Sequence, residues 1–295
     1  YIYLLYLLYV MVSGYFCYNI LVYTIALSNK PVMEVYLLHF ITAVMSFVKK
    51  VVIVTGASSG IGAAAAISFS KEGANVVLVG RNEYKLQKVK EECAKTGNDL
   101  LVVKADVSKE QDAEKIIKET VDKFNKIDIL VNNAGIVVEM SGILGDKVLA
   151  VYDSVMNTNL RAVVHITHLA VPYLIKSKGN IINISSVAGK MTMKTAPALA
   201  YSISKAALDH FTRCVAAELA PRGVRVNSVS PGPVKTDILD SAGVPISIES
   251  MAEIVALGRV SEAQEVADLI LFLASDKAIA ITGSDYVTDN GALLK

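Results

Sequence analysis

Short apolar runs alternate with helical stretches from Val51 onward, and this alternation constrains the fold more than any other feature of the sequence. The runs are continuously apolar, which is typical of strands buried on both faces of a parallel sheet. They are Val51–Thr55, Val76–Gly80, Leu100–Lys104, Ile127–Val131, Asn180–Ser185 and Val224–Val229. Between them, apolar side chains recur at helical spacing, as in Leu86–Cys93 and Ala113–Phe124. We therefore predict an α/β domain whose parallel sheet is covered by helices on both faces.

The first 44 residues differ in composition from the rest. They hold eight of the 13 Tyr residues and two charged side chains, Lys30 and Glu34. The uncharged stretch Tyr1–Asn29 exceeds the about 20 apolar residues that cross a bilayer core. Its Tyr residues, however, are spread along it rather than gathered at its ends. We predict a hydrophobic extension over residues 1–44, either a non-native leader or a membrane anchor, and one domain over residues 45–295.

Charge and cysteine usage exclude several classes of function. The chain has 29 Lys and Arg against 28 Asp and Glu, so it has no basic field for nucleic acid. Cys17, Cys93 and Cys214 are too far apart in sequence for a disulfide framework or a metal-ligand cluster. We expect no metal, no nucleic acid partner and a cytoplasmic location. A membrane location, with the domain facing the cytosol, is the alternative if residues 1–44 are an anchor.

A glycine-rich turn, Thr55–Gly62, follows the first strand and opens a helix. Glycines let backbone N–H groups approach a pyrophosphate, and the helix N-terminus adds partial positive charge. After the second strand, where NAD-preferring folds place Asp or Glu, the chain has Gly80-Arg81-Asn82. A guanidinium without a carboxylate favours a 2′-phosphate. We predict that NADP(H) is preferred over NAD(H); Arg81 as a solvated surface charge stays the alternative.

Two Tyr-x-x-x-Lys pairs carry the same spacing. Tyr201 and Lys205 share one helix face, where an ammonium lowers a phenol pKa from about 10. Tyr201 is thus a candidate proton donor. Tyr84 and Lys88 are equally spaced but follow the second strand, away from the expected chemistry. We predict that this second pair is not catalytic.

Two further polar residues accompany Tyr201. Ser186 follows the strand Asn180–Ser185, at the sheet edge where doubly wound folds bind ligands, and its hydroxyl could hold a substrate carbonyl. Asn159 could seat a water that relays protons to Lys205.

In this order, the motifs resemble those of the short-chain dehydrogenase/reductase superfamily, in its single-domain branch. Thr55–Gly62 resembles TGxxxGxG, Asn132–Gly135 the NNAG element, and Ser230–Thr236 the PGxxxT segment. The set Asn159, Ser186, Tyr201 and Lys205 resembles the catalytic tetrad. The phrases Phe211–Pro221 and Gly223–Val229 are most similar to insect and bacterial 3-oxoacyl-[acyl-carrier-protein] reductase-like enzymes.

This resemblance implies a single doubly wound Rossmann-type domain with a seven-stranded parallel sheet flanked by helices. It also implies a homotetramer that interconverts a carbonyl and a secondary alcohol by hydride transfer from or to NADP(H). Tyr201 would protonate the alkoxide and Lys205 would hold the nicotinamide ribose, while Asp106 would contact the adenine. The cofactor-binding residues that it implies are Gly56, Ser58, Ser59, Gly60, Ile61, Gly62, Arg81, Asp106, Asn133, Ala134, Gly135, Tyr201, Lys205, Pro231, Gly232, Val234 and Thr236.

The apolar segment 237–257 suggests a helix-rich lid over a small apolar carbonyl or alcohol, either aliphatic or isoprenoid and steroid-like. Packing of half of its apolar residues in the core stays an equal alternative. Two other functions stay open: a membrane-anchored lipid, steroid or retinoid reductase, and a non-catalytic nucleotide-sensing protein. Two departures from the family pattern are noted. Ser186 and Tyr201 are 15 positions apart, slightly more than usual, and Thr288-Asp289-Asn290-Gly291 replaces VDGG.

Overall fold

The computed structural model describes residues 46–138, 141–192, 198–241 and 247–295. The predictions for residues 1–44 lie outside these ranges. Within them, no helix is both long and apolar enough to cross a membrane.

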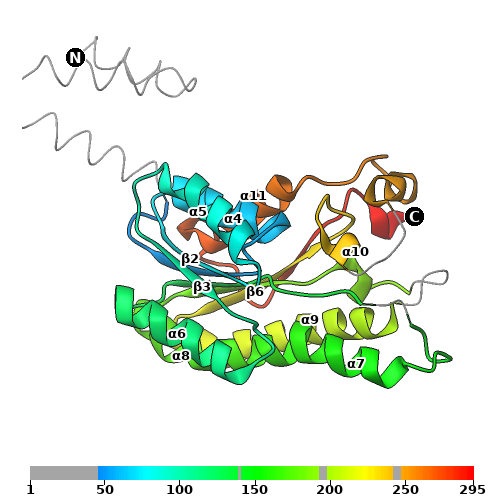
Figure 1. Cartoon of the computed structure of the whole chain (residues 1–295), viewed down its shortest axis with the longest axis horizontal. Helices are drawn as coiled ribbons and strands as arrows, with labels where there is room; N and C mark the ends of the chain where they lie inside the picture. The colour runs from blue at the N-terminus through cyan, green and yellow to red at the C-terminus, as the bar shows by residue number, and fades with distance from the viewer. Residues whose placement is uncertain (1–45, 139–140, 193–197, 242–246) are drawn as a thin grey trace, which may run out of the picture. The chain divides into compact units, whose positions relative to one another are not determined.

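Seven parallel strands form one sheet in the order β3-β2-β1-β4-β5-β6-β7 (Figure 1). The strands are β1 Val51–Thr55, β2 Asn75–Gly80, β3 Leu100–Lys104, β4 Ile129–Asn132, β5 Asn180–Ile184, β6 Arg225–Pro231 and β7 Asp285–Thr288. The predicted seven-stranded parallel sheet is confirmed. Each of the six apolar runs contains a strand, with ends that differ by at most a few residues.

Helices cover both faces of this sheet, with α4, α5 and α11 on one side and α6, α7, α8 and α9 on the other (Figure 1). The α-helices are α4 Gly60–Lys71, α5 Glu83–Ala94, α6 Glu110–Phe124, α7 Val148–Met156, α8 Ala162–Ser177, α9 Leu199–Leu219, α10 Ile238–Ser241 and α11 Ala263–Ala274. A short π-helix, η1 Asn157–Arg161, joins α7 to α8. Short 3-10 turns are η2 Val187–Gly189, η3 Ala220–Arg222, η4 Ile248–Ile254, η5 Asp276–Ala278 and η6 Ala292–Leu294.

Strand β1 illustrates why the runs are continuously apolar. Val52 and Val54 belong to the core cluster beneath α4 and α11, whereas Val51 and Ile53 belong to the cluster on the opposite face. Successive side chains of a strand point to opposite faces, so both sets are buried only when both faces are covered.

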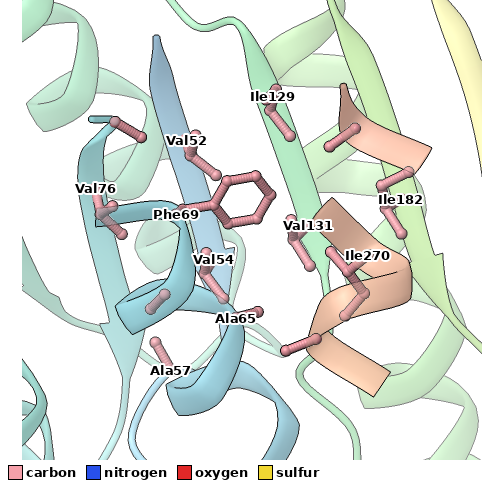
Figure 2. Close-up of a cluster of buried hydrophobic side chains, with 14 of the residues drawn as sticks. Val52, Val54, Ala57, Ala65, Phe69, Val76, Ile129, Val131, Ile182 and Ile270 are labelled. Atoms are coloured by element: carbon pink, nitrogen blue, oxygen red, sulfur yellow. The ribbon is translucent and has the colours of Figure 1, made fainter. Parts of the chain in front are cut away.

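Phe69 of α4 fills the first of these clusters (Figure 2). Small residues such as Ala65 and Ala66 let α4 pack closely on the sheet and on Ile270 of α11. Phe47 packs edge-on against Phe69, with ring centroids 4.9 Å apart. Burying such a ring contributes about 1.5–3 kcal/mol to the free energy of unfolding. Phe47 precedes β1, so the core includes a residue upstream of the first strand.

The chain reverses its direction of winding at β1, which pairs with β2 on one side and β4 on the other. Doubly wound folds bind ligands at such a point, beyond the carboxyl ends of the strands. Thr55 and Asn132 end the two strands here. The edge formed by β1 and β4 is therefore where the site is expected.

In its described residues, the predicted lid is α-helical only at α10. Its described parts are α10 and the 3-10 turn η4, and residues 242–246 lie outside the described ranges. The side chain of Ser247 accepts the N–H of Glu249, which starts a new turn at Ile248. Val255 is fully buried while Leu257 is 67% exposed, so the apolar residues divide between core and surface.

The sequence that replaces VDGG forms a well-bonded turn after β7. Asn290 has φ +52°, a left-handed conformation that Asn adopts more readily than most residues. Its amide donates to the carbonyl of Arg259 (2.9 Å) and to Ser261 Oγ (3.0 Å). The Asp289 carboxylate accepts the N–H groups of Gly291 and Leu293. This departure from the family pattern therefore retains an ordered turn.

Candidate active site

The glycine turn and the segment after β4 are held together by Thr55. Its Oγ1 accepts the N–H groups of Asn133 (3.0 Å) and Ala134 (3.1 Å). In return, Asn133 Nδ2 donates to the carbonyl oxygens of Thr55 (2.9 Å) and Gly56 (3.2 Å). The two motifs thus form one surface at the edge of β1 and β4.

Glycine is required in this turn by close backbone approach. A Cβ on Gly62 would lie 2.3 Å from the carbonyl oxygen of Gly56, and Gly56 itself has φ +67°. The N-cap residue Ser59 makes no side-chain capping bond, and no acidic residue lies in the first turn of α4. The helix N-terminus therefore presents N–H groups and partial positive charge to an anion. These residues fit the pyrophosphate of a dinucleotide.

The segment after β6 lies against the same turn. A Cβ on Gly60 would be 2.8 Å from Thr236 Cγ2, so Thr236 closes on the glycine turn. The next residue, Asp237, pairs with Lys85 of α5. The predicted PGxxxT segment thus ends beside the glycine turn, and the residue that follows it contacts α5.

Arg81 and Asp106 lie near each other beyond β2 and β3. Burial raises the pKa of Asp106, but hydrogen bonds from the hydroxyl (2.7 Å) and N–H (3.1 Å) of Ser108 and the nearby Arg81 charge lower it below its usual value. Arg81 is exposed, and its neighbour Asn82 caps α5 by accepting the N–H of Lys85. The Arg81 guanidinium is therefore accessible to a ligand.

The structure brings Asn159, Ser186, Tyr201 and Lys205 together from three separate elements. Ser186 precedes η2 and hydrogen-bonds the side chain of Tyr201 on α9. One turn further along α9, Lys205 Nζ donates to the carbonyl of Ile184 at the end of β5 (2.8 Å). A Cβ on Gly135 would lie 3.4 Å from Asn159 Oδ1 and 3.6 Å from Lys205 Nζ. Asn159 Oδ1 and Lys205 Nζ therefore lie close to the same point beside Gly135.

Asn159 lies on the π-helix η1, and short π-helical segments are frequent at functional sites. Its Oδ1 accepts the N–H of Ile136 (2.8 Å), and its Nδ2 donates to the Ile136 carbonyl (2.9 Å) and to Ser204 Oγ (3.2 Å). Both N–H groups of the amide thus join η1 to α9 and to the segment after β4, while Oδ1 keeps one lone pair.

Burial dominates the protonation of the central pair. Burial raises the pKa of Tyr201, and the hydrogen bond with Ser186 only partly offsets it. Burial also lowers the pKa of Lys205 to about 8, against the opposing charge of Asp209. The expectation that the Tyr201 pKa lies below its usual value of about 10 is therefore wrong, because the burial of the phenol outweighs the interaction that lowers its pKa.

The predicted site residues fall into two groups along the edge of the sheet. One group, at the ends of β1 to β3, is Gly56, Ser58, Ser59, Gly60, Ile61, Gly62, Arg81 and Asp106. The other, at the ends of β4 to β6, is Asn133, Ala134, Gly135, Asn159, Ser186, Tyr201, Lys205, Pro231, Gly232, Val234 and Thr236. Thr236 contacts the first group, so the two are continuous.

Sequence reasoning did not assign the roles of three residues of this region. Thr55 joins the two motifs, while Lys190 and Asp209 form an ion pair beside Lys205. Asp209 follows Lys205 by four positions and could have been found from helical spacing. Lys190 carries no comparable signal.

Comparisons with known proteins agree with this arrangement. The family model described as Enoyl-(Acyl carrier protein) reductase matches residues 56–292. A 3-oxoacyl-[acyl-carrier-protein] reductase from Synechocystis sp. is 38% identical over 83% of this chain and 97% of its own length. A meso-2,3-butanediol dehydrogenase from Serratia marcescens is 38% identical over 84% of this chain and 96% of its own.

A solved structure is similar over the same region. It is a short-chain dehydrogenase/reductase of unknown function from Caenorhabditis elegans with cofactor, 38% identical with a TM-score of 0.79. The alignment covers 84% of this chain and 97% of that one. The predicted family resemblance is confirmed: the chain belongs to the short-chain dehydrogenase/reductase superfamily and is a nicotinamide-dependent oxidoreductase acting on alcohol or carbonyl groups.

Proposed function

We propose that this oxidoreductase uses NADP(H) to interconvert a small apolar carbonyl compound and its secondary alcohol, with Tyr201 as the proton donor and acceptor. The observation that carries the proposal is the convergence of Ser186, Tyr201 and Lys205 beside the glycine turn. The phenol and the neighbouring hydroxyl are hydrogen-bonded, and the lysine lies one helical turn away.

The cofactor supplies the hydride, and the glycine turn with the N-terminus of α4 would hold its pyrophosphate. Arg81 and Asp106 would bind the adenosine end. Asn133, Gly135 and the segment Pro231–Thr236 would bind the nicotinamide end. These groups lie on one edge of the sheet and are joined by Thr236 beside Gly60.

The proton step is assigned to the Oη of Tyr201. In reduction, Oη gives its proton to the substrate oxygen as the carbonyl carbon becomes an alcohol carbon, and in oxidation it takes that proton back. The Oγ of Ser186 accepts the N–H of Ala188 (3.1 Å), which leaves its own hydrogen to donate to Tyr201 or to the substrate oxygen. Two donors can thus converge on one oxygen.

Lys205 and Asn159 support this step from the protein side. A buried ammonium favours the phenolate form of Tyr201 after the proton has left. Since the Asn159 amide is already used by Ile136 and Ser204, we assign to Asn159 the role of fixing η1 beside Lys205. The predicted water that relays protons to Lys205 would bind at the remaining lone pair of Asn159 Oδ1.

The preference for NADP(H) is supported by the exposed Arg81 and by the absence of a carboxylate in Gly80-Arg81-Asn82. A guanidinium binds a 2′-phosphate through paired, charge-assisted hydrogen bonds. Asn82 is engaged in capping α5 and adds no negative charge.

We further propose that the chain forms a homotetramer. Leu149 and Tyr152 on α7 and Val164 on α8 are 72%, 37% and 42% exposed, beside a groove lined by Met156 and Leu160. Such an apolar surface fits a second copy of the chain. A second candidate contact surface is α11 with residues 292–295, where Val266 and Ile270 are buried but Phe272 and Leu294 are exposed. Light scattering at micromolar concentration tests this, and a monomer contradicts it.

Purified chain, NADPH or NADH, and a panel of carbonyl compounds test the function. The panel contains 3-oxoacyl thioesters, aliphatic ketones and vicinal diketones, and the loss of reduced-nicotinamide absorbance is followed. Turnover that prefers NADPH supports the proposal. Tight NADPH binding without turnover of any substrate favours the nucleotide-sensing alternative instead.

A further inference from the structure

Lys190 ties two carboxylates together beside the helix that carries Lys205. Its Nζ lies 2.6 Å from Asp209 Oδ2 on α9, 2.8 Å from Asp285 Oδ2 on β7 and 3.0 Å from Ser230 Oγ on β6. The Lys190, Asp209 and Asp285 side chains are 25%, 8% and 17% exposed. This is a largely buried cluster, built from three segments far apart in sequence.

The two carboxylates differ in how completely they are satisfied. Asp285 Oδ1 accepts the hydroxyls of Ser228 (2.8 Å) and Ser230 (2.6 Å), in addition to the Lys190 contact at Oδ2. Asp209 Oδ1, in contrast, is buried and has no hydrogen-bond partner among the described residues. A buried, unpaired carboxylate oxygen is costly unless a nearby charge compensates it.

The charges of the cluster do not balance by themselves. Two carboxylates and one ammonium leave one negative charge in a region with little access to water. Lys205 is 4% exposed and lies one turn before Asp209 on the same face of α9. The protonated Lys205 therefore brings the group to neutrality, and each member is costly to leave without the others.

We infer that Asp209, anchored by Lys190 and Asp285, is a positioning residue that keeps the Lys205 ammonium charged inside the protein. Its consequence for catalysis rests on the proposed function, in which that ammonium stabilises the Tyr201 phenolate. Among the described residues, the titratable groups around Lys205 are Tyr201 and Asp209 on α9, with Lys190 and Asp285 one contact further away. Burial lowers the pKa of Lys205 to about 8, and Asp209 opposes this decrease.

The titration of Lys205 in the full chain tests the inference directly. Lysine is labelled with ¹³C at Cε, the Lys205 resonance is assigned with Lys205→Met, and its pKa is read from the shift against pH. Asp209→Asn removes the compensating charge and is expected to lower the Lys205 pKa by about one pH unit. Lys190→Met leaves both carboxylates without their cation and is expected to raise it by a similar amount.

The opposite signs separate electrostatics from structural damage. Loosening of α9 would admit water and raise the Lys205 pKa toward its usual value in both variants. Asp209→Glu keeps the charge and is expected to stay near the wild-type value. Asp122→Asn breaks the exposed 2.6 Å ion pair with Lys118 on α6 and is the matched control. An unchanged or raised Lys205 pKa in Asp209→Asn overturns the inference. If that variant does not fold, a Lys205 pKa that fails to rise in Lys190→Met overturns it.

A second readout separates this inference from the proposed function. The alkaline limb of kcat/KM against pH is expected to move with the Lys205 pKa, downward in Asp209→Asn and upward in Lys190→Met. If the Lys205 resonance moves while the alkaline limb does not, the catalytic role of Lys205 is wrong and the charge compensation stands. If neither moves, the compensation itself is wrong.

Discussion

The two Tyr-x-x-x-Lys pairs have the same spacing on a helix but different surroundings. On α5, Tyr84 is 70% exposed and Lys88 Nζ lies 4.5 Å from its ring centroid. On α9, Lys205 Nζ lies 5.5 Å from the ring centroid of Tyr201. The closer cation–ring contact thus belongs to the pair that we predict to be inactive. Proximity along a helix does not by itself create a reactive phenol.

Burial and the neighbouring strand distinguish the second pair. Lys205 is nearly inaccessible and donates to the end of β5, and Tyr201 is hydrogen-bonded to Ser186. The pair on α5 faces solvent, where a cation–π contact is worth about 0.5–1 kcal/mol. We therefore expect proton transfer only at the Tyr-x-x-x-Lys pair that is buried beside a second hydroxyl at the sheet edge.

The sharpest test of this comparison exchanges each phenol for a phenyl ring. Tyr201→Phe removes the transferable proton and is expected to lower kcat by about 10²–10⁴-fold while the dissociation constant of NADPH stays nearly unchanged. Tyr84→Phe is expected to leave kcat within about twofold of wild type. Steady-state kinetics and cofactor fluorescence measure both. Comparable losses in the two variants would remove the distinction between the pairs.

The second largest effect is expected on cofactor preference. We propose that the region around α5 selects between NADPH and NADH and takes no part in hydride or proton transfer. Gly80→Asp with Arg81→Ala exchanges the 2′-phosphate contact for a carboxylate and is expected to shift the NADPH/NADH ratio of kcat/KM by on the order of 10²-fold toward NADH. A Cβ atom at position 80 would lie no closer than 3.4 Å to Leu86 and Ser58, which is an ordinary contact. A wild-type protein that already prefers NADH would contradict the assignment.

Replacing the lysine is expected to change the free energy of unfolding at the α9 pair but not at the α5 pair. The Lys205 pKa of about 8 lies below its usual 10.5, so the buried ammonium destabilises the fold below pH 8 and the cost disappears above pH 10.5. Lys205→Met removes this cost but leaves Asp209 without its compensating charge, so the free energy of unfolding at pH 7 is expected to rise by at most roughly 1–3 kcal/mol, with a smaller gain as pH rises from 8 to 10.5. Denaturant titrations at several pH values measure it. Lys88→Met has no buried charge to remove, and a similar gain there would contradict this explanation.

The smallest effect is expected from breaking the contact on α5. Tyr84→Leu removes the exposed ring over which Lys88 lies and is expected to cost about 0.5 kcal/mol, with kcat/KM unchanged. Thermal unfolding and steady-state kinetics give the two quantities. A marked loss of activity with little loss of stability would show that the pair on α5 takes part in function after all.

Local patterns in the sequence predicted most of the fold. The apolar runs placed six strands within a few residues, because a strand buried on both faces needs a continuous apolar run. The glycine turn and the Tyr201–Lys205 pair were found for the same reason, since each depends on neighbours a few positions away, whereas the residues after β4 were identified by the family resemblance. The predicted lid was the weakest part, because Ser247 starts a separate turn within it.

By itself, then, the sequence determined the fold class, the family and the position of the glycine turn and of the Tyr201–Lys205 pair. Only the tertiary structure decided the charge environment of that pair. Strand pairing of β6 with β7 brings Asp285 to Lys190, and packing of α9 brings Asp209 to both, so no local spacing encodes the cluster. Burial, a property of the whole fold, raises the pKa of Tyr201 where helical spacing alone predicted a decrease.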